Sequence, residues 1–205
     1  MLALGFMGNM VQANSIGAAF TEAFGAFNIT ISPVIIGVIV AAIAAFVFLG
    51  GTQRLASVVE KVVPIMAGVY IVGSLILIIM NIANVPAAIK MIFVGAFDPQ
   101  AVLGAGAGIA VKEAIRFGVA RGLFSNEAGM GSTPHAHARA TAENPHKQGL
   151  CAMISVFIDT FVILNLTVFS VLTTGALESG KNGTALTQAA FMRGFGSFGI
   201  VFVAV

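Results

Sequence analysis

The chain has 205 residues, of which 58% are hydrophobic and only 9% are charged, and its mean hydropathy is +1.01. Soluble domains carry roughly a quarter charged residues, so this composition excludes a soluble class and predicts an all-α integral membrane protein in a lipid bilayer. The net charge of +2 gives no reason to expect a nucleic-acid partner. The single cysteine, Cys151, excludes an internal disulfide framework and a cysteine-based zinc site.

About six spans of roughly 20 residues are predicted, because the apolar runs are continuous rather than alternating as in a membrane barrel. Ser32 and Pro33 suit the N-cap and first turn of the second span. Gly50 and Gly51 end that span, and a polar connector over 52–61 follows it. The expected spans cover about residues 1–26, 34–49, 64–82, 109–142, 150–174 and 187–205.

The segment between the third and fourth spans is mixed in character. Residues 86–97 favour a short interfacial helix, Asp98 and Pro99 start a turn, and the glycines of 104–108 form a flexible joint. This joint divides the chain into residues 1–103 and 104–205, with three spans in each part. Both ends of the chain lie in apolar sequence, so we expect it to be a fragment of a longer polypeptide.

Basic residues predict the orientation of the spans. Arg54 and Lys61 lie in the connector after the second span, and Arg139 and Lys147 lie in the connector after the fourth. Loops on the opposite side carry fewer basic residues, so connectors 52–61 and 134–148 are expected to be cytoplasmic.

The fourth span contains a polar, glycine-rich stretch from Ser125 to Gly131, and this stretch carries Glu127. Irregular backbone at membrane depth is tolerated only where it is buried in protein or lines a cavity. An opened helix offers free carbonyls to a cation and free N–H groups to a carboxylate, which suits a zwitterionic amino acid. The alternative is a kinked helix with packing glycines, in which Glu127 pairs with Arg121.

Two further spans carry polar side chains at membrane depth. Asn9 and Gln12 lie three residues apart in the first span and share a helical face, which predicts a cavity wall or interhelical hydrogen bonds. Asp159 lies near the expected midplane of the fifth span, with Thr160 beside it. A carboxylate at this depth predicts that Asp159 forms a coupling-ion or proton site, or a buried pair with an arginine of the fourth span. His135 and His137 are two residues apart and do not share a helical face, so no metal centre is expected.

The stretch Gly118-Val-Ala-Arg-Gly-Leu-Phe-Ser-Asn-Glu-Ala-Gly-Met-Gly-Ser132 resembles the signature of the sodium:alanine symporters, also called the alanine or glycine:cation symporter family. Three further segments resemble the same family. They are Gly8 to Ser15, Arg54 to Pro64, and Gln148 through Thr160.

The resemblance implies part of a leucine-transporter-type fold of two inverted five-helix repeats. Residues 1–103 would supply the last three helices of the first repeat with a connecting segment, and 104–205 the first three of the second, including one discontinuous helix. It implies a multi-pass transporter of the plasma (inner) membrane, not an enzyme, which moves alanine or glycine with sodium as coupling ion and needs no cofactor.

The resemblance also implies which residues contact the substrate. In the fourth span these are Phe124, Ser125 and Glu127, with the neighbouring Asn126, Ala128 and Gly129. In the first span the resemblance implies that Gln12 contacts the substrate, and Asn9 lies on the same helical face as Gln12. The first, ninth and tenth core helices of the family have no counterpart in these residues, so about half a site is expected here. Two alternatives remain open: a membrane-embedded enzyme or channel that uses Glu127 and Asp159 as proton carriers, and a structural membrane subunit.

Overall fold

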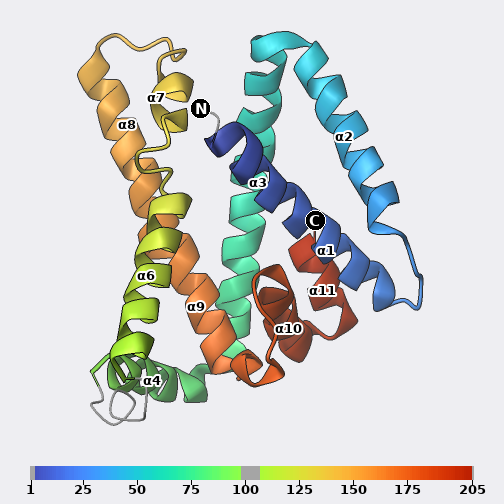
Figure 1. The fold of residues 1–205 in the computed structure, drawn as a ribbon, viewed down its shortest axis with the longest axis vertical. Helices are drawn as coiled ribbons and strands as arrows, with labels where there is room; N and C mark the ends of the chain where they lie inside the picture. The colour runs from blue at the N-terminus through green and yellow to red at the C-terminus, as the bar shows by residue number, and fades with distance from the viewer. Residues whose placement is uncertain (1–2, 98–106, 205) are drawn as a thin grey trace. The chain divides into compact units, whose positions relative to one another are not determined.

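The computed structural model describes residues 3–97 and 107–204, and no strand occurs among them. The all-helical class predicted from composition is therefore confirmed for these residues. Contacts divide the chain into two units: unit 1 comprises Met1–Met7 and Val85–Asn165, and unit 2 comprises Gly8–Asn84 and Leu166–Val205. Each unit is described by itself below, and Figure 1 labels the helices in chain order.

Unit 2 combines helices from the N-terminal and C-terminal parts of the chain. Its helices lie at or close to the positions expected from the apolar runs, with the differences given below. They are α1 (Asn9–Gly25), α2 (Pro33–Leu49), α3 (Gly51–Met80), the 3-10 turn Ile82–Asn84, most of α9 (Leu164–Thr173), the 3-10 turn Ala176–Ser179, α10 (Thr184–Phe195) and α11 (Ser197–Ala204).

The core of unit 2 forms around Phe191 of α10, whose side chain is fully buried. Its ring stacks on Tyr70 of α3 at 5.8 Å and on Phe202 of α11 at 5.2 Å between centroids. The α3 helix also packs against α9, where the Tyr70 hydroxyl lies 2.6 Å from the Thr167 hydroxyl. Gln188 is buried beside this core and donates to the carbonyls of Ala19 at 2.9 Å and Ile200 at 3.1 Å.

The third span begins earlier than the sequence predicted. The α3 helix starts at Gly51 and contains Pro64, so the predicted connector over 52–61 and the start near Pro64 are wrong. Residues 52–61 include Leu55, Ala56, Glu60 and Lys61, which favour helix once the tight turn at Gly50 and Gly51 has reversed the chain. Pro33 lies in the first turn of α2 as predicted, and Ser32 occupies the N-cap without a side-chain capping hydrogen bond.

The predicted sixth span is two helices rather than one. Its first helix begins at Thr184, and Gly196, with φ of 63°, ends it before α11 starts at Ser197. The two helices pack closely on each other and are drawn in red in Figure 1. Gly199 permits this approach, because a Cβ there would lie 2.2 Å from the Phe191 carbonyl oxygen. The expectation of one continuous span over 187–205 is therefore wrong.

Unit 1 contains the predicted interfacial helix and the broken fourth span. The α4 helix covers Val85–Phe97, which confirms a helix over 86–97, while its interfacial position stays a prediction. It is followed by α6 (Ala107–Ser125), α7 (Ser132–His137), α8 (Pro145–Phe157) and the π-helical segment η3 (Ile158–Ile163). The predicted turn at Asp98 and Pro99 and residues 104–106 of the predicted joint lie outside the described residues, so the division at 103/104 stays a prediction.

Two helices among the described residues are long and apolar enough to cross a membrane. They are Gly51–Met80, with 30 residues, and the continuous helix Pro145–Thr173, with 29 residues. The α2 helix and residues Ile82–Gly95 are apolar but shorter. The described residues thus support a helical membrane protein, and the count of six spans stays a prediction.

Candidate functional site

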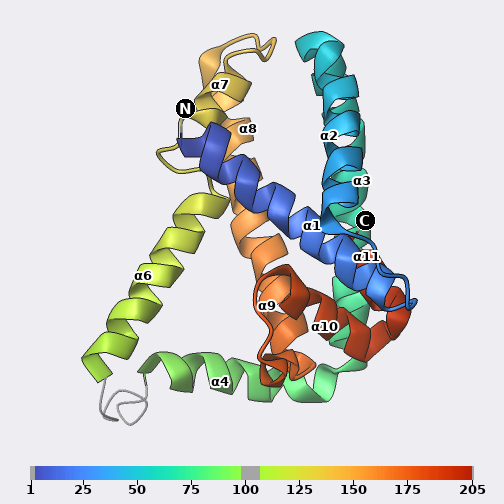
Figure 2. The same cartoon turned by 45° about the vertical axis from the view of Figure 1, so that its right-hand side comes forward.

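The fourth span is broken where the sequence predicted. The α6 helix ends at Ser125, residues 126–131 form a turn, and α7 begins at Ser132. Figure 2 shows α6 and α7 as separate helices joined by this turn. Gly129 and Gly131 have φ of 78° and 83°, as expected of glycines that permit a left-handed backbone. An unbroken helix through this region would have removed the basis for a binding site.

The end of α6 has the hydrogen-bond pattern of a Schellman motif. The N–H of Ala128 donates to the Leu123 carbonyl at 2.9 Å, and the N–H of Glu127 donates to the Phe124 carbonyl at 3.2 Å. Glu127 occupies the left-handed position of this motif, with φ of 52°. Among the described residues, the carbonyl oxygens of Ser125 and Asn126 receive no hydrogen bond. The break therefore leaves two oxygens open for a ligand.

The fifth span contains an irregularity at the level of this break. Residues Ile158–Ile163 adopt a π-helix, which includes Asp159 and Thr160. Such segments interrupt the α-helical ladder and are frequent at functional sites. The Asn165 side chain donates to the carbonyls of Thr160 and Phe161, each at 3.1 Å, and so satisfies carbonyls next to the irregular turn.

Two side-chain hydrogen bonds join the break to the π-helical segment. The Ser125 hydroxyl donates to Asp159 Oδ2 at 2.6 Å, and the Thr160 hydroxyl donates to Asn126 Oδ1 at 2.9 Å. All four side chains are half-buried. Consecutive residues of one helix end thus pair with consecutive residues of another helix. The result is an oxygen-rich cluster with one carboxylate, which suits a hard cation such as sodium.

Glu127 and Asp159 have hydrogen-bond partners other than the arginines that the sequence offered as alternatives. Glu127 Oε2 accepts hydrogen bonds from the hydroxyls of Ser132 and Thr133, the latter at 3.2 Å. In the described part of the chain, neither Glu127 nor Asp159 forms an ion pair with an arginine. The alternatives in which an arginine of the fourth span neutralises these acids are therefore not supported. The oxygens Glu127 Oε1 and Asp159 Oδ1 have no hydrogen-bond partner among the described residues.

The remaining predicted contacts are placed in different surroundings. Phe124 is half-buried, while Ala128 and Gly129 lie exposed in the turn. Asn9 and Gln12 lie on an exposed part of α1, which belongs to unit 2. Their proximity to the break therefore stays a prediction.

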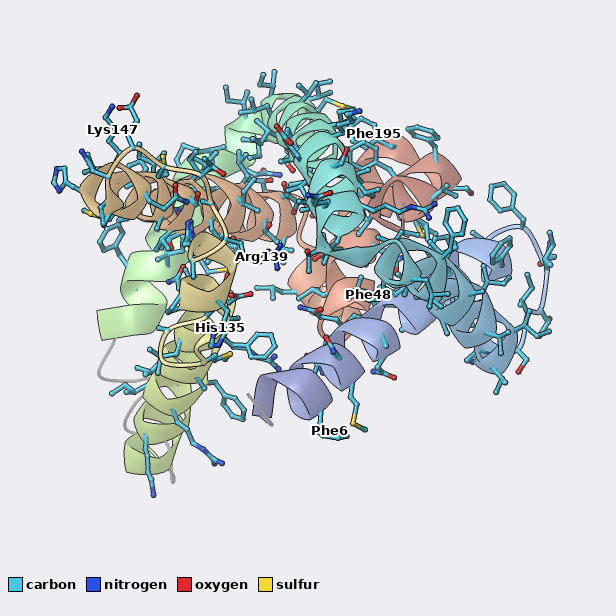
Figure 3. All side chains as sticks on the ribbon, turned by 90° about the horizontal axis from the view of Figure 1, so that it is seen from above. Phe6, Phe48, His135, Arg139, Lys147 and Phe195 are labelled. Carbon is cyan, nitrogen blue, oxygen red and sulfur yellow. The ribbon has the colours of Figure 1, made fainter. Side chains whose placement is uncertain are left out.

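The connector after the break is held by polar contacts of its own. The Asn144 side chain caps α8 by accepting from the N–H of Lys147 at 2.8 Å. The Lys147 side chain pairs with Glu143, and Figure 3 shows it pointing away from the ribbon. His137 contacts the Gln148 amide at 2.6 Å, beside a groove of about 490 Å³ between α7 and α8. No cluster of three metal-binding side chains occurs in the described ranges.

Sequence reasoning missed the roles of Ser132 and Thr133, and it indicated no hydrogen-bond partner for Asn165, a weaker candidate of the fifth span. A serine and a threonine that follow a glycine-rich break are a signal for a new helix start. Asn165 donates to the carbonyls of the residues five and four positions before it. This spacing alone does not identify a contact, because it becomes informative only once the segment is known to be π-helical. Gly118 and Gly122 of α6 lie four residues apart, a spacing that lets helices approach closely in membranes. No neighbouring atom lies within 4 Å of a Cβ built at either glycine in the described residues.

The apolar helices, the interrupted helix and the oxygen cluster between two helices are features of a helical membrane transporter. Residues 1–205 match the sodium:alanine symporter family over their whole length, and the chain belongs to this family. The resemblance noted in the signature around Ser125 is thereby confirmed.

Three relatives illustrate the range of the family. The chain is 42% identical over 96% of its length to an uncharacterized transporter, YflA, of Bacillus subtilis, of which it covers 41%. It is 38% identical over its full length to a probable sodium/glutamine symporter, GlnT, of the same organism, again covering 41%. It is 36% identical over 95% of its length to a sodium/proton-dependent alanine carrier protein of Bacillus sp. strain PS3, covering 45%. The chain therefore spans less than half the length of these relatives.

Proposed function

We propose that the complete protein that carries this chain is a secondary transporter that couples the uptake of a small neutral amino acid, alanine or glycine, to sodium. The observation that carries the proposal is the pairing of Ser125 and Asn126 at the helix break with Asp159 and Thr160 of the π-helical segment. Membership of a symporter family and the alanine carrier among the relatives support it.

Within this function, the oxygen cluster serves as the site of the coupling ion. Sodium prefers oxygen ligands, and discontinuous helices in transporters offer it unwound carbonyls. The open carbonyls of Ser125 and Asn126 and the open Oδ1 of Asp159 are the ligands that this chain contributes. The single negative charge of Asp159 offsets the charge of the ion.

The substrate occupies the region next to the ion. Glu127 Oε1 attracts the ammonium group of the amino acid, while Phe124 and the exposed backbone of Ala128 and Gly129 line its small side chain. The family signature around Gly8 to Ser15 adds Gln12, with Asn9 beside it on α1, as further substrate contacts. The protein resides as a multi-pass protein in the plasma (inner) membrane.

The test is uptake of radiolabelled alanine into proteoliposomes that contain the complete protein. An inward sodium gradient should drive accumulation, an equal proton gradient should not, and unlabelled glycine should compete better than glutamine. Accumulation that follows only the proton gradient would replace sodium by the proton as coupling ion. The absence of uptake of any amino acid under either gradient would overturn the proposal.

A matched substitution tests the charge of Glu127. Glu127→Gln removes the negative charge and keeps an acceptor oxygen for Ser132 and Thr133. It should therefore raise the alanine concentration for half-maximal uptake about thirtyfold, which corresponds to about 2 kcal/mol for an ionic contact in a partly desolvated site. Glu143→Gln is the control, because the Glu143 side chain is 80% exposed and pairs with Lys147. Wild-type uptake by Glu127→Gln would remove Glu127 from the substrate site.

A further inference from the structure

Glu127 occupies a backbone position that normally belongs to glycine. In the Schellman motif that ends α6, the residue in the left-handed conformation is usually glycine, because a Cβ there crowds the backbone. Glu127 adopts this conformation with φ of 52°. A strained residue of this kind persists only where the surrounding structure stabilises it, and such residues gather at functional sites. The side chain of Glu127 must therefore supply something that glycine lacks.

The hydrogen bonds of the Glu127 carboxylate show what it supplies. Its Oε2 accepts from the hydroxyls of Ser132 and Thr133, which are the first two residues of α7. Gly131, the N-cap residue of α7, has no side chain to cap that helix. The carboxylate thus connects the last turn of one half-helix to the first turn of the next. We call this set of contacts the Glu127–Ser132–Thr133 clasp.

We propose that Glu127 is a positioning residue, whose clasp fixes the turn over residues 126–131 and thereby the direction of the open Ser125 and Asn126 carbonyls. This proposal rests on the proposed function, because it assigns those carbonyls to the coupling ion. It adds a second role for Glu127 that is carried by Oε2 and leaves Oε1 open. The clasp acts on sodium through geometry, whereas a ligand role of Glu127 acts through charge.

The geometric role is separated from the charge by removing the two donors. Ser132→Ala with Thr133→Val abolishes the clasp and keeps the Glu127 carboxylate. The matched control is Ser155→Ala with Thr141→Val, which removes two exposed hydroxyls of the same unit that have no hydrogen bond to residues 125–131 in the described part of the chain. Ser132→Thr with Thr133→Ser keeps both donors and should restore wild-type behaviour.

The first measurement does not depend on transport. Amide hydrogen–deuterium exchange of the segment 126–138 is followed in the complete protein in lipid nanodiscs. Loss of two hydrogen bonds to a carboxylate should speed exchange about tenfold, with no change in the control. Unchanged exchange in the double variant would overturn the clasp. The exchange measurement can be interpreted even if the unaltered protein transports nothing. In that case only the proposed function fails.

The second measurement connects the clasp to the ion. In proteoliposomes, the double variant should raise the sodium concentration for half-maximal alanine uptake about fivefold to tenfold, with the maximal rate lowered less. Glu127→Gly relieves the left-handed strain but also removes the carboxylate, so it should raise the sodium concentration for half-maximal uptake as well. Its combination with the double variant should add little, because both changes break the same contacts. A normal sodium constant together with fast exchange, or simple additivity, would reduce the clasp to a local stabilising contact and refute the positioning role.

Discussion

Replacing Asp159 with asparagine is the most direct perturbation of the proposed ion site. Asparagine has nearly the same shape and keeps an oxygen that accepts from the Ser125 hydroxyl, now 2.6 Å from Asp159 Oδ2. The change therefore removes the negative charge and little else. The charge matters because, among the described residues, no arginine or lysine neutralises Asp159.

The size of the effect follows from the surroundings of the carboxylate. Two unit charges about 4 Å apart interact by about 4 kcal/mol at an effective dielectric constant of about 20. Asp159 is half-buried, so water screens part of this interaction. We expect a loss of about 2 kcal/mol, which is roughly a thirtyfold rise in the sodium concentration for half-maximal uptake.

The assay is sodium-dependent alanine uptake by the complete protein in proteoliposomes, normalised to inserted protein. Glu178→Gln is the control, since Glu178 belongs to unit 2, is 84% exposed and has its carboxylate 4.0 Å from the Arg193 guanidinium. A sodium constant that stays at the wild-type value in Asp159→Asn would refute the ion-site reasoning. A lower yield of folded protein with an unchanged sodium constant would instead assign Asp159 a structural role.

Three smaller changes test neighbouring features. Thr160→Val removes the donor to Asn126 at 2.9 Å and should raise the sodium constant about fivefold in the uptake assay. Gly199→Ala places a Cβ 2.2 Å from a backbone oxygen and should destabilise the protein by about 1–3 kcal/mol in thermal unfolding, whereas Gly17→Ala, with open space around it, should not. Gln188→Met removes two buried hydrogen bonds and should cost about 1 kcal/mol in the same measurement. Unfolding temperatures equal to wild type for Gly199→Ala would contradict the close approach of α10 and α11.

Much of this chain could be predicted from local features of its sequence. Continuous apolar runs predict helices in a membrane protein, because a bilayer leaves the backbone no other partner. The break at Ser125–Gly131 was predictable for the same kind of reason, since glycine permits left-handed backbone at residues 129 and 131. The signature around that break predicted the family, which the match over residues 1–205 confirms.

Other features depend on contacts that no local pattern contains. The start of α3 at Gly51 and the turn at Gly196 were missed, because polarity was read as a connector over 52–61 and one glycine divides the apolar run of the predicted sixth span. The sequence indicated that Glu127 and Asp159 are important acids, but their partners were assigned only by the fold. Ser132 and Thr133 reach Glu127 across the turn over residues 126–131, and Ser125 reaches Asp159 across 34 residues because two helices lie side by side. Composition and glycine placement act through the local backbone, whereas pairing between distant residues is decided by packing in three dimensions.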